Sequence, residues 1–177
     1  MSNYITSYIF IMLMTPSLVI FDFDANSNLS NWNVVNDGVM GGISKAKLEI
    51  NQDGNAIFKG TVSLENNGGF ASLRYRFNTK EVGEYTKVII RLKGDKTTYQ
   101  FRTKTNAYDR HSYIALFETT GEWQTIEISL SEMYPAFRGR KLSIPNYPSE
   151  QMQEIAFLIG NKKAENFKLE IDKISLQ

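Results

Sequence analysis

The stretch Phe70-Ala71-Ser72-Leu73-Arg74-Tyr75-Arg76-Phe77 sets the fold class of this chain. Ala71, Leu73, Tyr75 and Phe77 fall on one side, and the serine and both arginines fall on the other. Strict alternation of this kind is typical of a β-strand that buries one face and exposes the other. The stretch therefore predicts a sheet with a packed inner side and arginine on its outer side.

Alternating or short apolar stretches continue on both sides of this strand. Lys45–Ile50 and Ala56–Val62 are separated by Asn51-Gln52-Asp53-Gly54-Asn55, whose Asp-Gly pair is a strong hairpin signal. Helical periodicity is scarce, and only one helical turn is expected, from Pro148 to Gln153. Further strands are expected over 18–23, 87–93, 98–103, 112–117, 123–130, 155–159 and 167–176.

The end of the chain carries two more signals. Apolar residues of the closing strand change parity between Ile171 and Ile174, which indicates a β-bulge near Asp172-Lys173. Residues 133–147 hold two prolines and one glycine, so we expect a long packed loop there. About ten short antiparallel strands with frequent turns predict an all-β sandwich or barrel, in one domain over residues 18–177.

Residues 1–17 form an apolar segment that contains no Lys or Arg. An export signal begins with cationic residues and a mitochondrial presequence is rich in arginine. The segment therefore fits a degenerate export signal, a short anchor or a frayed start, and we see no mitochondrial presequence. Thr15-Pro16-Ser17 interrupts the apolar run, so no stable membrane span is expected. A location in the bacterial cytoplasm or periplasm is compatible with these features.

Composition restricts the chemistry that the chain can carry. The 177 residues include no cysteine, which removes disulfides, thiol nucleophiles and zinc–thiolate sites. His111 is the single histidine and lies in a polar stretch, so multi-histidine metal sites are excluded and we expect no metal or cofactor. A net charge of +1 disfavours a general nucleic-acid surface, although a local basic patch remains compatible with it. Neither a nucleophile elbow nor a carboxylate pair stands out, which indicates that the protein is not an enzyme.

Several stretches together resemble the complex I intermediate-associated protein 30 family. They occur in the family's order from about Phe21 to the C-terminus. These stretches are Trp32 with Asn36-Asp37-Gly38-Val39-Met40-Gly41-Gly42-Ile43-Ser44, Phe58-Lys59-Gly60 with 62–74, Lys93-Gly94-Asp95 with Tyr99-Gln100-Phe101-Arg102, Gly121-Glu122-Trp123-Gln124-Thr125, Phe137-Arg138-Gly139-Arg140, 155–160 and 167–174.

The resemblance implies a galactose-binding-like jelly roll, which agrees with the strand pattern. Eukaryotic members help to assemble respiratory complex I and are absent from the finished enzyme. Bacterial and plastid relatives have less defined roles, some of them linked to RNA. Because a fold hosts many functions, the resemblance carries fold further than function. The missing presequence favours a free-standing bacterial version.

Three polar side chains are the main candidates for a binding site. Arg74, Gln100 and Arg102 all lie opposite core-facing residues on their strands. Arginine suits carboxylate, phosphate and sugar hydroxyl groups, so we expect these three to line a binding face, with the Asp37–Gly42 loop at its rim. The alternative is that they are ordinary outward residues of alternating strands.

Two loops supply further candidates. In the glycine-rich loop, Asp37, Gly41 and Gly42 either form a tight connection in which Asp37 accepts hydrogen bonds from nearby amides, or offer bare amides as an anion nest. In the basic stretch Phe137-Arg138-Gly139-Arg140-Lys141, the cations Arg138 and Arg140 either contact a partner or are merely solvated.

The leading function hypothesis is a non-catalytic module that binds a protein client, such as a respiratory-chain subunit, as an assembly factor or chaperone does. The alternative is a carbohydrate-binding module of galactose-binding-like type, with a glycan as partner. That alternative requires an exposed aromatic ring or a calcium-supported loop, and the two tryptophans, Trp32 and Trp123, are the candidate rings. Exposure of either ring beside Arg102 would favour the glycan, whereas burial of both would disfavour it.

Overall fold

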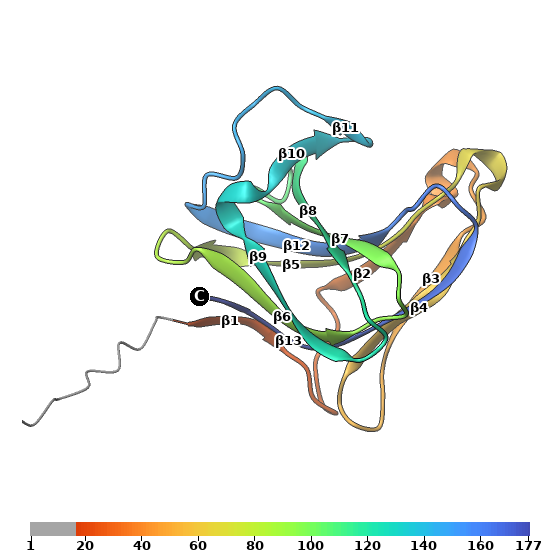
Figure 1. The fold of residues 1–177 in the computed structure, drawn as a ribbon, viewed down its shortest axis with the longest axis horizontal. Coiled ribbons are helices and arrows are strands. Elements are labelled where there is room, and N and C mark those ends of the chain that lie inside the picture. Colours follow the sequence, from red (N-terminus) through yellow and green to blue (C-terminus); the bar gives the residue numbers. More distant parts are fainter. Residues whose placement is uncertain (1–16) are drawn as a thin grey trace, which may run out of the picture.

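A computed structural model describes residues 17–177, which form two antiparallel sheets packed face to face (Figure 1). The predicted all-β sandwich is confirmed, with thirteen strands in place of about ten. The six-stranded sheet contains β1 (Leu18–Asp22), β3 (Lys45–Ile50), β4 (Ala56–Val62), β6 (Lys87–Lys93), β9 (Trp123–Ser129) and β13 (Glu165–Leu176). The seven-stranded sheet runs β11 (Arg140–Lys141), β10 (Tyr134–Phe137), β8 (Ser112–Glu118), β7 (Thr98–Lys104), β12 (Gln151–Ile159), β5 (Ala71–Glu81) and β2 (Trp32–Asn36).

Three short 3₁₀ turns are the helical segments of the described residues: η1 (Asp37–Met40), η2 (Glu65–Asn67) and η3 (Leu130–Glu132). No helix in this part of the chain has both the length and the apolar character needed to cross a membrane. The expected leader or anchor over residues 1–17 lies, apart from its last residue, outside the described residues.

The core lies between the two sheets and comes from the apolar side of each alternating strand. Leu73, Phe101 and Phe157 are fully buried on the seven-stranded sheet, and Ile90 and Leu169 are fully buried on the six-stranded sheet. Each such side chain contributes about 1.5–3 kcal/mol by leaving water. The same alternation turns the intervening polar residues of β5 and β7 away from the core.

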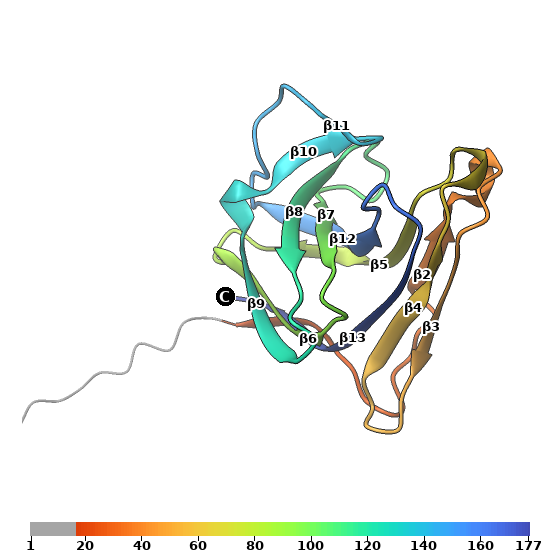
Figure 2. The ribbon, with the colours of Figure 1, turned by 45° about the vertical axis from the view of Figure 1, so that its right-hand side comes forward.

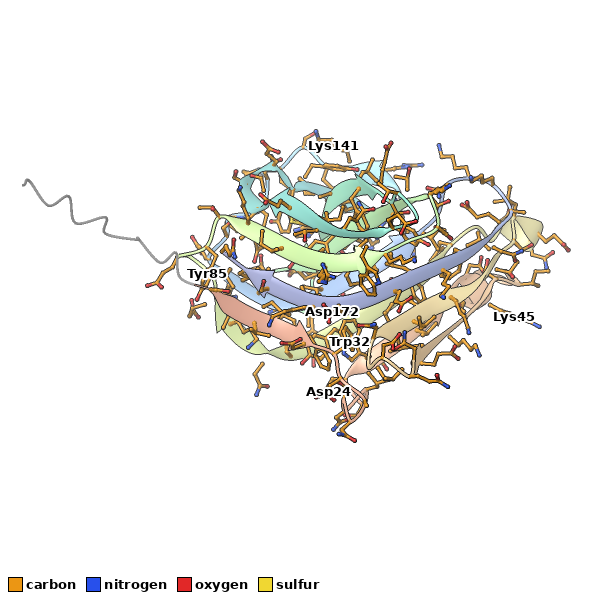
Figure 3. All side chains as sticks on the ribbon, turned by 60° about the horizontal axis from the view of Figure 1, so that its bottom comes forward. Asp24, Trp32, Lys45, Tyr85, Lys141 and Asp172 are labelled. Carbon is orange, nitrogen blue, oxygen red and sulfur yellow. The ribbon has the colours of Figure 1, made fainter. Side chains whose placement is uncertain are left out.

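An aromatic cluster joins β1 and β2 to the sandwich. The Trp32 ring stacks on Tyr75 of β5, with centroids 4.6 Å apart, and Phe21 and Phe23 pack on the same indole at 5.3 and 5.2 Å. Trp32 is 6% exposed. Figure 3 labels it among the side chains of the lower side of the sandwich. Trp32, the first residue of the stretch that resembles the family, is therefore a core residue.

β13 organises the six-stranded sheet. On one edge, the first half of β13 pairs with β4 and its last residues pair with β1. On the other edge, β13 pairs with β6 from Glu170 to Leu176. The pairing of β13 with β6 shifts register between Ile171 and Lys173, so the bulge predicted at Asp172-Lys173 is confirmed. This irregularity lets the apolar residues before and after it face the same core.

Two local predictions were wrong. Residues 133–147 are not only loop, because they contain β10 and β11, which form a small hairpin. No helical turn spans Pro148 to Gln153, because Gln151 already begins β12 and pairs with Glu81 of β5. β5 extends four residues beyond the expected Phe77. The backbone N–H and C=O groups of this extension pair with β12. This tertiary pairing outweighs any local preference of residues 148–153 for a helix.

Candidate ligand-binding groove

A row of paired residues crosses the face of the seven-stranded sheet that points away from the core. Arg74 of β5 is opposite Ala156 of β12, and Ala156 is in turn opposite Arg102 of β7. Neighbouring strands lie about 4.8 Å apart, so the two arginine backbones are separated by about 10 Å across one alanine. Both arginines face outward because their neighbours Leu73 and Phe101 are fully buried.

This face forms the floor of a groove of about 580 Å³. One wall comes from the loop after η2, through Asn67, Gly69 and Phe70, and the other comes from the turn between β10 and β11, residues 137–139. Figures 1 and 2 show the β10–β11 hairpin above the sheet and the η1 and η2 loops at one end of it. The groove therefore lies between two loop regions that are far apart in sequence.

The groove carries a surplus of positive charge. Arg74, Arg102, Lys104, Arg110 and Arg138 line it, and Glu154 is the acidic residue among its lining side chains. Glu154 is already engaged, with Arg76 Nε at 2.7 Å and Lys104 Nζ at 3.8 Å. Among the described residues, neither Arg74 nor Arg102 forms an ion pair. An anion would meet uncompensated cations here.

Arg102 is oriented by a neutral partner. Its Nε and Nη2 donate to Oε1 of Gln100 at 2.9 and 2.5 Å, from two positions away on the same strand. Burial, and then the nearby Arg74 cation, lower the pKa of Arg102 to about 10. The guanidinium remains charged at neutral pH, and the amide fixes its direction without neutralising it.

The β10–β11 turn places two cations on one ring. The Cζ atoms of Arg110 and Arg138 lie 5.0 and 5.3 Å from the centroid of Phe137. Arg138 and Gly139 both have positive φ, 47° and 76°, as expected at the centre of a two-residue hairpin turn. A non-glycine residue with positive φ is uncommon, and Arg138 is among the residues that line the groove.

Asp37 lies behind the other wall. Its buried carboxylate accepts hydrogen bonds from Ser44 N at 3.1 Å, Ser44 Oγ at 2.5 Å, Gly69 N at 2.6 Å and Phe70 N at 3.3 Å. Burial acts to raise the pKa of Asp37, but these hydrogen bonds outweigh it and the net shift is downward. Asp37 thus ties the end of η1, the start of β3 and the groove wall together.

Two glycines pack directly on this carboxylate. A Cβ atom at Gly42 or at Gly68 would collide with the Asp37 side chain. Gly41 adopts a φ of 85° and its N–H caps η1, so it serves the turn itself. The glycine-rich loop therefore forms a tight connection that supports the groove wall. The carboxylate of Asp37 accepts hydrogen bonds within this loop and from the wall, and it does not line the groove.

The structure brings four of the eight predicted site residues together on the groove: Arg74, Gln100, Arg102 and Arg138. Arg140 is exposed on the far side of the same hairpin turn. Asp37, Gly41 and Gly42 stand behind the wall. Sequence reasoning missed Lys104 and Arg110, although Lys104 continues the alternation of Gln100 and Arg102 by one more step.

The tryptophans are outside the groove. Trp32 is in the core, and Trp123 lies on the six-stranded sheet, where Arg91 stacks on it with Cζ 5.3 Å from the ring. Phe70 and Phe137 line the groove together with Arg102, and Tyr134 lines an adjoining hollow with it. Neither tryptophan is exposed beside Arg102, which removes the stacking platform that a glycan site was expected to use.

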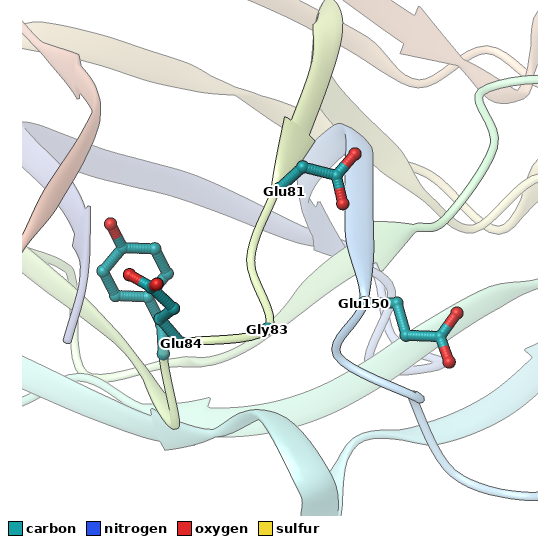
Figure 4. A pocket seen from close by; sticks show the side chains of 5 residues that line it. Glu81, Gly83, Glu84 and Glu150 are labelled. Carbon is teal, nitrogen blue, oxygen red and sulfur yellow. The ribbon is translucent and has the colours of Figure 1, made fainter.

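A second hollow has the opposite charge. Figure 4 shows Glu81, Glu84 and Glu150 around Gly83, where β5 ends and β12 begins, in a space of about 510 Å³. Within the described residues, no group of three His, Cys, Asp or Glu side chains is arranged to hold a metal. The cationic groove is therefore the stronger candidate for ligand binding.

Comparison with known proteins supports one family. The sequence model of Complex I intermediate-associated protein 30 (CIA30) matches residues 21–171. The mitochondrial protein of that name from Drosophila melanogaster is 26% identical over 184 residues, which cover 90% of this chain. The match spans 62% of the length of that relative.

Solved structures with a similar fold are carbohydrate-binding modules and agarases. A family 11 module from a Clostridium thermocellum cellulase superposes with a TM-score of 0.67 at 16% identity, and covers 92% of this chain and 95% of the module. An exo-β-agarase gives a TM-score of 0.58 at 12% identity, covering 90% of this chain and 25% of the agarase. At these identities the likeness shows the fold alone, a two-sheet antiparallel β-sandwich like that of the carbohydrate-binding modules.

Proposed function

The chain belongs to the complex I intermediate-associated protein 30 family, and from this premise we propose that it is a non-catalytic module that binds a protein client in the cationic groove. A role as an assembly factor follows from the family, whose name refers to an intermediate of complex I. The client would be a respiratory-chain subunit that is bound transiently.

The surplus of cations in the groove is the observation that supports this proposal most. Burying a guanidinium without an acidic partner costs stability, and here Arg102 is held in that state beside Arg74. Residues that lower stability in this way are retained where they bind something.

Site-specific crosslinking tests the proposal. A photoreactive phenylalanine would replace Leu116, which is 59% exposed on the groove side of β8, in the native host. The control carries the same group at Trp123, on the opposite sheet. We expect a discrete adduct with a respiratory-chain subunit from position 116 and none from position 123. Equal labelling from both positions would contradict the proposal.

A carbohydrate ligand is the second candidate. Its support is the similarity of the fold to the family 11 module, which has been solved with a mixed-linked β-1,3-1,4 tetrasaccharide. Affinity electrophoresis in mixed-linked β-glucan gels tests it. We expect no retardation, because neither tryptophan reaches the groove. Retardation that disappears in the variant Arg102→Gln would instead establish glycan binding.

A further inference from the structure

We infer, resting on the proposed function, that the groove selects an acidic peptide segment and holds one of its carboxylates between Arg74 and Arg102, above Ala156. The two guanidiniums come from strands on either side of β12, and the residue between them is small. The methyl group of Ala156 leaves space over the middle strand. Two arginine side chains that start about 10 Å apart can converge on a single oxyanion in that space.

The charges of the neighbouring row explain why an anion from outside is needed. In the neighbouring row, the Glu154 carboxylate is already shared by two cations, Arg76 and Lys104. The side chain of Glu154 is 4% exposed and pairs with Arg76 and Lys104 of its own row, so it does not pair with Arg74 or Arg102. Arg74 and Arg102 are therefore left without an acidic partner, beside a row in which two cations already share one carboxylate.

Gln100 prepares Arg102 for this task as a positioning residue. The amide oxygen of Gln100 accepts hydrogen bonds from Nε–H and one N–H of Nη2 of Arg102. Both N–H groups of Nη1 and the second N–H of Nη2 remain available to a ligand. A guanidinium held along one edge loses little further freedom when a carboxylate binds to the other. An acidic residue in place of Gln100 would neutralise the same cation from within.

The apolar surfaces beside the arginines favour a peptide over other anions. Leu158 and Leu116 lie in the next row of the face, on either side of Gln100; Leu158 is 7% exposed in the floor of the groove, and Leu116 is 59% exposed beside it. Such surfaces match a chain that places apolar side chains between its carboxylates. Single-stranded nucleic acids and glycans commonly stack on exposed aromatic rings, and of the two rings that line the groove Phe70 is only partly exposed. The ring of Phe137 instead packs against Arg110 and Arg138.

Fluorescence anisotropy with a labelled octapeptide of alternating Glu and Leu tests the inference, with a second peptide in which every Glu is Gln. We expect Arg74→Gln and Arg102→Gln each to weaken binding of the Glu peptide about ten-fold or more. Arg91→Gln removes the same charge from the opposite sheet and should change the affinity less than about two-fold. Gln100→Glu should weaken binding as the arginine variants do.

Several outcomes would overturn the inference. Equal binding of the Gln peptide would show that carboxylates are not recognised. Tighter binding of oligogalacturonate, poly(U) or inorganic phosphate than of the Glu peptide would assign the site to a different class of anion. An equal loss in Arg91→Gln would show that only net charge matters.

Blocking variants separate this inference from the proposed function. Ala156→Phe fills the space between the arginines, and Ser112→Trp fills the groove from β8 if the first variant fails to fold. Client crosslinking that is lost in a folded blocking variant but kept in Arg74→Gln and Arg102→Gln would refute the carboxylate site alone. Crosslinking that persists in the blocking variants would refute client binding in the groove itself.

Discussion

The Nε atom of Arg76 lies 2.7 Å from Oε2 of Glu154, and this pair closes one end of the row of charges in the groove. Glu154 is 3% exposed and also faces Lys104, whose side chain is 12% exposed. The carboxylate thus compensates a cation that has little access to water. Because burial lowers the pKa of Lys104 while Glu154 opposes that shift, the two side chains depend on each other.

Replacing Glu154 with Gln should destabilise the protein by about 2 kcal/mol, because the poorly exposed Lys104 would lose its carboxylate and keep only the carbonyl oxygens of Ala107 and Asp109. Lys87→Gln should cost less than about 1 kcal/mol, since both members of its ion pair with Glu127 are about half exposed. Chemical denaturation of both variants measures the difference. Similar losses in the two variants would show that burial of Lys104 is not the cause.

Gly42→Ala should lower the free energy of unfolding by about 2 kcal/mol, because the new methyl group collides with the Asp37 carboxylate. Gly38 offers a matched control in the same loop, since a Cβ atom there meets nothing within 4 Å. Gly38→Ala should leave the stability nearly unchanged. Thermal unfolding of the two variants, measured in parallel, tests whether the close approach is the reason for glycine at position 42.

Asp37 should make part of the stability dependent on acid. Its pKa in the folded protein is lower than the ordinary value of 3.8, so its contribution is complete above that value and is lost as the pH falls through the folded pKa. Asp37→Asn should therefore be less stable at neutral pH and should lose less on acidification. Urea midpoints from pH 7 down to pH 2 check the sign. Parallel curves for the two proteins would contradict this role.

Trp32→Ala should cost about 3–5 kcal/mol, because it empties the centre of the aromatic cluster with Tyr75, Phe21 and Phe23. Trp123→Phe should cost far less, since that ring lies at the surface under Arg91. The same variant leaves Trp32 as the one tryptophan, so its emission reports on a buried indole. Emission typical of a solvent-exposed indole in Trp123→Phe would contradict the burial of Trp32.

Much of the fold could be read from single strands, whereas the site depends on which strands are neighbours. Alternation placed Arg74 and Arg102 on outward faces, but nothing in their own strands says that β12 lies between them. Arg91 and Gln124 show the same outward pattern and belong to the other sheet. Period-two patterns fix the face of a residue and leave its sheet undetermined.

The loops were harder still to predict. Asp37 was an obvious candidate because of its glycine-rich surroundings, but its partners Gly69 and Phe70 are more than thirty residues away in sequence. Local composition therefore indicates that the loop needs unusual backbone conformations, but it does not show which amides bind the Asp37 carboxylate. The sequence does not predict the hairpin of β10 and β11, because its strands are only four and two residues long and show no clear alternation.

The central place of β13 has a consequence for how the fold is reached. This strand follows every other strand in sequence, yet β1, β4 and β6 all hydrogen-bond to it, with Leu18 opposite Leu176. During synthesis, β4 can pair with β3 and β6 with β9, but each of them keeps one open edge, and β1 has no partner in its sheet, until β13 emerges from the ribosome. Completion of this sheet is consequently a late and highly non-local event, a topology that folds slowly and leaves open strand edges in the incomplete chain.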